Sequence, residues 1–191
     1  MIRTIYAAVF AAAVMSPLAA TAQTVTLSPA NPQPSAGALS PGLAVSYARM
    51  PSAVRELAGA AKALQKGAKP GKPLAGLSYD DTDQKVLTSD SYEKIAADIS
   101  GYIKFDRAGT YMLEFLNNDG LELSIGGQQV ALYDGIHACG YAGEIEVNVP
   151  QAGYYPLKAT YFQRKGTACL MMEWGPDSDG LETVPDSAFF H

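Results

Sequence analysis

Period-two alternation of apolar and polar residues, repeated from Ile95 to Trp174, constrains the fold of this chain more than any other feature. Such alternation places every second side chain on one face of a β-strand. The alternating segments are short and are separated by clusters of Gly, Pro, Asn or Asp, which favour turns. Many short strands in this order predict an all-β fold, an antiparallel sandwich or barrel whose sheets each have a solvated face.

The clearest turn in this region is Asn118–Gly120. An Asp-Gly pair between two alternating segments is a strong hairpin signal, so we predict a β-hairpin here. The pair Gly126-Gly127 predicts the turn into the next strand. The apolar positions of the predicted hairpin are Tyr111, Leu113 and Phe115 before the turn and Leu121, Leu123 and Ile125 after it.

One segment upstream has helical rather than strand periodicity. Val54–Leu64 is rich in Ala, its apolar residues recur at helical spacing, and Ser52 could serve as its N-cap. We therefore predict one short helix, preceded by a first strand at Leu43–Tyr47. Lys66–Pro73 carries three lysines between Gly and Pro residues, and we interpret it as a solvated loop.

The N-terminus has the three parts of a secretory signal peptide. Arg3 supplies a positive charge, Ile5–Met15 is an apolar run, and Ala20–Ala22 has small residues at the cleavage-site positions. The run is too short for a permanent transmembrane helix, which needs about 20 residues. We predict a signal peptide over residues 1–22 and export to the periplasm or the medium. A buried N-terminal helix is the alternative.

The segment after the predicted cleavage site, residues 23–40, is rich in Pro, Ser, Ala and Asn. This composition is typical of an extended linker. The remaining residues, 41–191, are enough for one domain. We therefore predict a single domain after the linker, and no transmembrane segment once the signal peptide is removed.

The sequence contains two cysteines, Cys139 and Cys169, both in the predicted domain. In an oxidising compartment an even number of cysteines favours a disulfide. Two separate buried thiols are the alternative, because cysteine also behaves as a small core residue.

The charge and the motifs of the chain exclude several functions. A net charge of −5 is unlike that of nucleic-acid-binding domains, which have a basic face. None of the common motifs for hydrolysis, phosphate binding or dinucleotide binding is present. Asp80, Asp81 and Asp83 are close in sequence, but a polar loop explains them. We therefore predict a protein that is not an enzyme.

The segment Asn117–Gly120 has a second interpretation besides a turn. Amide and carboxylate oxygens at a loop tip suit Ca²⁺, which takes six to eight oxygen ligands. Asn118 and Asp119 would supply two of them, and Asp134 with nearby carbonyl groups could complete the site. Asn and Asp also favour turns for conformational reasons. From spacing alone, the turn is the stronger interpretation.

Five segments in order, including GYIKF, GTYMLEF and AGYYPLKATYF, resemble the protective-antigen domain family, abbreviated PA14. The resemblance covers about residues 41–190. The matching segments are Gly101–Phe105, Gly109–Phe115, Asn117–Gly127, Ala152–Phe162 and Ala168–Trp174.

This resemblance implies an antiparallel β-sandwich with barrel-like closure that binds carbohydrate. In lectin-like members, two adjacent Asp residues hold Ca²⁺, and these positions match Asn118 and Asp119. The first residue here is Asn, which removes one formal charge from such a site. The resemblance thus predicts an exported module that binds a glycan, with Ca²⁺ as its cofactor. A structural or protein-interaction domain of the cell envelope is the alternative. The predicted glycan-binding residues are Asn117, Asn118, Asp119, Asp134 and His137.

Overall fold

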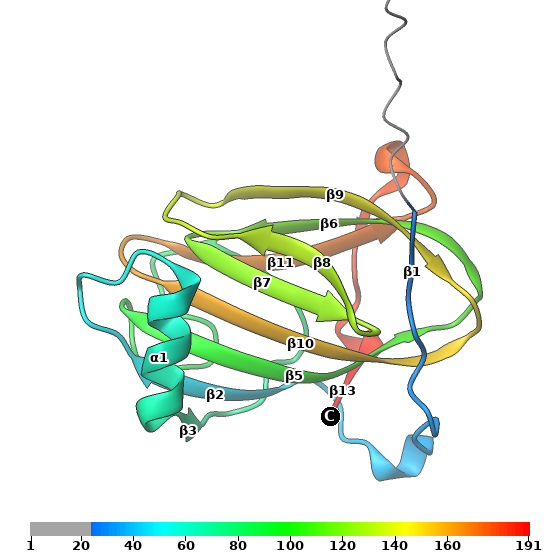
Figure 1. The fold of residues 1–191 in the computed structure, drawn as a ribbon, viewed down its shortest axis with the longest axis horizontal. Coiled ribbons are helices and arrows are strands. Elements are labelled where there is room, and N and C mark those ends of the chain that lie inside the picture. Colours follow the sequence, from blue (N-terminus) through cyan, green and yellow to red (C-terminus); the bar gives the residue numbers. More distant parts are fainter. Residues whose placement is uncertain (1–23) are drawn as a thin grey trace, which may run out of the picture.

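The computed structural model describes residues 24–191, so the predicted signal peptide lies outside the described residues (Figure 1). Two sheets pack face to face, and all strand pairs are antiparallel except β1 with β9. The first sheet contains β1 (Val25–Thr26), β9 (Gly140–Val149), β6 (Gly109–Asn117), β11 (Ala168–Gly175) and β12 (Glu182–Thr183), with β4 (Ser78–Thr82) also paired to β11. The second contains β3 (Lys69–Pro70), β2 (Ala44–Arg49), β5 (Ile95–Phe105), β10 (Gly153–Gln163), β7 (Gly120–Ile125) and β8 (Gln128–Tyr133), with β13 (Phe189–Phe190) paired to β5.

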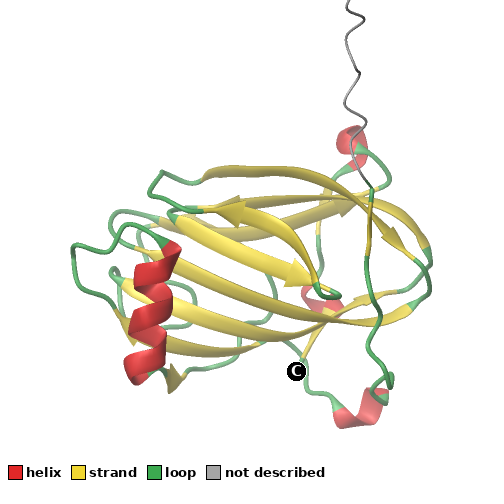
Figure 2. Ribbon diagram, viewed as in Figure 1, coloured by secondary structure: helices red, strands yellow, loops and turns green. Residues whose placement is uncertain are grey.

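The all-β sandwich is confirmed, but the barrel-like closure is wrong. Within residues 24–191 neither sheet closes on itself, and each keeps two edges. Between β5 and β11 the chain passes from one sheet to the other at five connections: β5–β6, β6–β7, β8–β9, β9–β10 and β10–β11. Each strand pairs within one sheet only, so the two hydrogen-bond ladders stay separate. Figure 2 draws in green the loops and turns at which the chain crosses between the sheets.

The predicted hairpin at Asn118–Gly120 is also wrong. β6 pairs with β9 and β11 in the first sheet, whereas β7 pairs with β10 and β8 in the second. The turn between β6 and β7 is therefore a corner that joins the two layers. Period-two alternation had identified the buried face of each strand correctly, but it carries no information about which strand lies alongside. The turn at Gly126-Gly127 does join a hairpin, β7 with β8.

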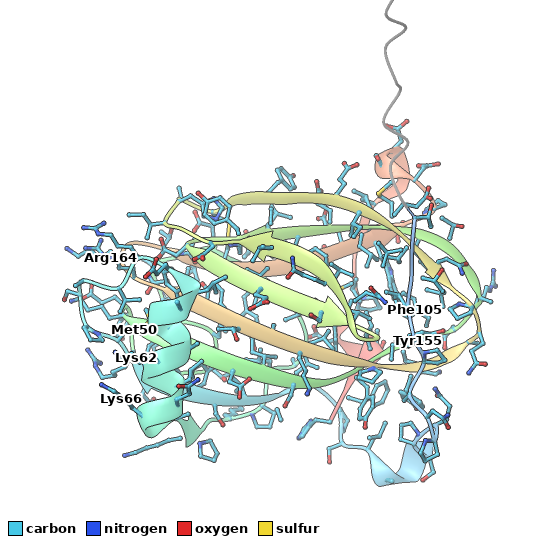
Figure 3. All side chains as sticks on the ribbon, in the orientation of Figure 1. Met50, Lys62, Lys66, Phe105, Tyr155 and Arg164 are labelled. Carbon is cyan, nitrogen blue, oxygen red and sulfur yellow. A yellow bond between two sulfur atoms is a disulfide. The ribbon has the colours of Figure 1, made fainter. Side chains whose placement is uncertain are left out.

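The core lies between the two sheets and includes a group of packed aromatic side chains. The Phe105 ring is fully buried and packs edge-on against Tyr155, with ring centroids 5.3 Å apart (Figure 3). Trp174 packs against the same Phe105 ring, with ring centroids 5.4 Å apart. Burying one large apolar side chain stabilises a fold by about 1.5–3 kcal/mol.

The helix α1 (Leu57–Gly67) begins and ends three residues later than predicted. Residues before it form a turn, in which the Val54 amide donates to the Pro51 carbonyl. Leu57 and Ala60 are buried, and the helix covers one end of the second sheet through a small cluster with Phe162. The N-cap position is occupied by Glu56, so the predicted N-cap at Ser52 is wrong.

None of the helices described in residues 24–191 is long and apolar enough to cross a bilayer. Three short 3₁₀ helices complete the fold, at Ala36–Ala38, Ser178–Gly180 and Asp186–Ala188.

Three segments interpreted as linker or loops contribute strands. In the Pro-rich segment, β1 pairs with β9, and Leu27 is only 1% exposed. Lys69–Pro70 pairs with β2, and Ser78–Thr82, which includes two of the three clustered aspartates, pairs with β11. These segments lack clear alternation because two of the strands have two residues each and the third is largely exposed.

Candidate functional site

The corner between β6 and β7 is held from inside by the side chain of Asn118, which is 2% exposed. Its Oδ1 accepts hydrogen bonds from the Cys169 amide, at 3.1 Å, and from the Tyr161 hydroxyl. The backbone N–H of Asn118 in turn donates to the Cys169 carbonyl at 3.3 Å. Since a backbone N–H can only donate, the atom that faces it must be the carboxamide oxygen. The side chain therefore points into the core and its orientation is fixed.

Asp119 makes the sharp bend of the corner, with a positive φ of 52°. Its amide donates to the His137 carbonyl at 3.1 Å, and its Oδ2 accepts from the Arg164 amide at 2.6 Å. Burial raises the pKa of Asp119, and the amides of Arg164 and His137 oppose part of that rise. Asp119 thus joins three connections of the chain: the corner, the β8–β9 loop and the β10–β11 turn.

His137 lies on the β8–β9 loop beside the corner. Its ring stacks on Tyr133 with centroids 3.7 Å apart, and its Nε2 lies 3.2 Å from Nδ2 of Asn117. Burial lowers the pKa of His137 and so favours the neutral ring, while Asp119 opposes part of this effect. Asn117 also donates to the Asp119 carbonyl at 2.8 Å. Its buried Oδ1 has no hydrogen-bond partner within the described residues.

The two cysteines form a disulfide, which confirms that alternative over two separate thiols. Cys139 and Cys169 have Cα atoms 5.9 Å apart and are separated by 30 positions. The bond joins the β8–β9 loop to the start of β11, where Cys169 also contacts Asn118. The disulfide therefore fixes the loop that carries His137.

These connections surround a hollow of about 340 Å³ at one end of the sandwich. Asp119, His137, Arg164 and Lys165 line it together with an apolar residue, Ile136, which is 42% exposed. Figure 3 labels Arg164 at this end of the molecule. Such a surface can accept hydrogen bonds, donate them and cover an apolar face. The lining residues are Asn118, Asp119, Ile136, His137, Ala138, Arg164, Lys165, Gly166 and Thr167.

The structure brings together only some of the predicted site residues. Asn118, Asp119 and His137 line the hollow, and Asn117 lies beside it. Asp134 does not line it: its Oδ1 accepts from the Leu57 amide at 2.6 Å. It thereby satisfies an N–H of the first turn of α1, which lacks a side-chain cap from Glu56.

The turn residues Arg164, Lys165 and Thr167 were missed as site residues. The sequence does not connect them with the corner, because Arg164 follows Asp119 by 45 positions and no motif links the two. Pairing of β10 with β7 and of β11 with β6 brings the turn beside Asp119.

The contacts of Asn118 and Asp119 do not fit a calcium ion held by both side chains. Oδ1 of Asn118 is occupied by two donors, and Nδ2 of Asn118 lies 3.4 Å from Oδ2 of Asp119. Calcium takes oxygen ligands, and an amide nitrogen is not among them. The predicted pair thus offers the carboxylate of Asp119 alone.

Millimolar Ca²⁺ added after EDTA is therefore expected to leave the thermal midpoint of the protein unchanged, because a ligand stabilises only the state that it binds. Differential scanning fluorimetry measures this. Asn118→Asp is the matched comparison, since its second carboxylate oxygen would replace Nδ2 beside Asp119. A calcium-dependent rise in the unaltered protein that disappears in Asp119→Ala would show that the site binds calcium after all.

A family model described as PA14 domain matches residues 72–188. Among solved structures, the PA14 domain of the MpAFP antifreeze protein has 16% identity and a TM-score of 0.68, covering 80% of this chain and 91% of that chain. The PA14 sugar-binding domain from an RTX adhesin has 16% identity and a TM-score of 0.60, and the match covers 79% of this chain and 98% of that chain. The Epithelial Adhesin 9 A domain from Candida glabrata, in complex with Galβ1-3GlcNAc, has 15% identity and a TM-score of 0.66, covering 88% and 96%.

A search of curated proteins found no match. At 15–16% identity, the similar structures support the fold alone. The family model, however, matches more than half of the chain, and its range includes the corner, the disulfide and the hollow. The chain belongs to the PA14 domain family.

Proposed function

We propose that this protein is an exported, non-catalytic module that binds a glycan in the hollow at the β6–β7 corner. The observation that carries the proposal is the meeting of Asp119, His137 and Arg164, from three separate connections, in one hollow. Two of the similar structures support it, because one is described as a sugar-binding domain and the other holds a disaccharide.

The side chains of the hollow suit a sugar without a metal ion. The carboxylate of Asp119 can accept from sugar hydroxyls, and hydrogen bonds to charged groups are stronger than those between neutral ones. Lys165, which is exposed, can donate to hydroxyl oxygens. Ile136 offers an apolar surface to the C–H face of the ring. A few polar groups beside an apolar wall are typical of small-ligand sites.

A glycan array with the full-length exported protein tests the proposal. Asp119→Asn keeps the shape of the side chain but removes the charge, and we expect it to weaken binding of any array hit by about tenfold, since a charged hydrogen bond contributes about 1.5–3 kcal/mol. Asp83→Asn is the matched control, because Asp83 is exposed and outside the hollow. Its affinity should equal that of the unaltered protein.

Two results would overturn the proposal: an array without hits, or an affinity that Asp119→Asn leaves unchanged. The first would favour the alternative of a structural or protein-interaction domain of the envelope. One observation already agrees with that alternative, since the Asn118 side chain is used entirely for internal hydrogen bonds.

A further inference from the structure

A second and larger depression, of about 950 Å³, shares no lining residue with the hollow at the β6–β7 corner. It runs between the C-terminal half of α1, the strands β2 and β3, and the loop that precedes β5. Figure 3 labels Lys66 on α1 at this side of the molecule. We call this depression the basic groove, because four cationic side chains line it: Arg49, Lys66, Lys69 and Lys72.

The four cations of the basic groove have no acidic partner within residues 24–191. The ion pairs found among the described residues involve other lysines, namely Lys85, Lys94 and Lys104. Asp90 is the one acidic residue that lines the groove, and Lys85 already pairs with it at 3.0 Å. The groove is therefore positive on a chain whose net charge is −5. A concave surface of one sign concentrates its field on a ligand of the opposite sign.

The floor of the basic groove has a fixed shape. The hydroxyl of Tyr47 lies 2.8 Å from Oγ1 of Thr88 and accepts from the Thr88 amide at 3.1 Å. The Tyr47 ring packs against Gly71, where a Cβ atom would lie 2.5 Å from a ring carbon. Pro51 and Pro70 also line the groove. The groove thus combines an aromatic ring held in place, proline rings and free cations.

We propose that the basic groove binds an acidic oligosaccharide. Its cations would pair with carboxylate groups, and Tyr47 with the two prolines would contact the apolar faces of the sugar rings. A nucleic acid fits less well, because proteins that bind its backbone have a broad basic face, whereas this chain is acidic outside the groove. The proposal does not depend on the hollow at the β6–β7 corner.

The test measures binding of oligomannuronate, an acidic sugar chain, by calorimetry with the full-length exported protein. A neutral oligomannoside of the same length is the control ligand. Oligomannuronate should bind, and its affinity should fall as salt is added, since salt screens exposed charges. The neutral chain should not bind the groove. Asp119→Asn should bind oligomannuronate as well as the unaltered protein, which separates this site from the hollow.

Two matched double variants locate the site. Lys69→Gln with Lys72→Gln removes two cations of the groove, and Lys104→Gln with Lys158→Gln removes two cations elsewhere, so both change the net charge equally. The first should weaken oligomannuronate binding about tenfold, the size expected when two exposed charge contacts are lost, and the second less than about twofold. All four side chains are at least partly exposed, so both variants should fold.

Three outcomes would overturn the proposal. Equal losses in the two double variants would mean that net charge, and not the groove, attracts the ligand. Equal affinity for the neutral oligomannoside and for oligomannuronate would show that the cations of the groove do not contribute to binding. Tighter binding of a single-stranded oligonucleotide, or of vesicles with anionic headgroups, would assign the groove to a different class of ligand.

Discussion

Replacing both cysteines, in Cys139→Ala with Cys169→Ala, is expected to lower the free energy of unfolding by about 3–4 kcal/mol. The disulfide closes a loop of 30 positions, and opening that loop raises the conformational entropy of the unfolded chain. Because a domain of this size is stable by only about 5–15 kcal/mol, the loss is a large fraction of the total. Urea denaturation followed by circular dichroism measures it.

Reduction of the unaltered protein separates the two parts of this effect. Reduced protein keeps both sulfur atoms, so its loss of stability measures the cross-link alone. The double alanine variant also loses the packing of Cys169, which is fully buried, and should be slightly less stable still. Oxidised and reduced protein of equal stability would contradict the prediction. The disulfide also holds the loop of His137, so reduction should weaken the glycan binding that we propose for the hollow.

The sandwich could be predicted from the sequence because the alternation records burial directly. Leu113, Phe115, Leu121 and Leu123 face the core as predicted. The pattern could not predict that β6 and β7 belong to different sheets, because a residue in either sheet of a sandwich faces the same core. That assignment depends on pairing with β9, β10 and β11, which are more distant in the sequence.

The candidate site was predictable only where its residues are neighbours in the sequence or match the family pattern. Asn118 and Asp119 are predictable in this way, whereas no motif in the sequence places His137 beside them. Asp134, a predicted glycan-binding residue, does not line the hollow, and its hydrogen-bond partner, the Leu57 amide, is 77 positions away in the sequence. The role of Asn118 was missed for the same reason: the donors that occupy it come from β10 and β11.

The internal role of Asn118 leads to the second large effect. Asn118→Ala should lower the free energy of unfolding by about 3 kcal/mol, because it leaves two buried donors, the Cys169 amide and the Tyr161 hydroxyl, without an acceptor. Each buried polar group that loses its partner costs about 1–3 kcal/mol. Burial also raises the pKa of Tyr161 well above its usual value, so the hydroxyl stays protonated and cannot avoid the cost by ionising. Thermal and urea denaturation measure the loss.

A double-mutant cycle distinguishes this mechanism from a simple loss of packing. Tyr161→Phe removes one of the two orphaned donors, so Asn118→Ala with Tyr161→Phe should be less destabilised than the sum of the single variants, by about 1 kcal/mol. Asn117→Ala is the neighbouring control: the Oδ1 that it removes has no hydrogen-bond partner within the described residues, so no buried donor loses an acceptor, and it should cost less than Asn118→Ala. Strict additivity in the cycle would show that the Tyr161 hydroxyl and Asn118 contribute independently. In that case the corner would be held by its backbone hydrogen bonds to Cys169 and His137, and Asn118 would be free to turn toward a ligand in the hollow.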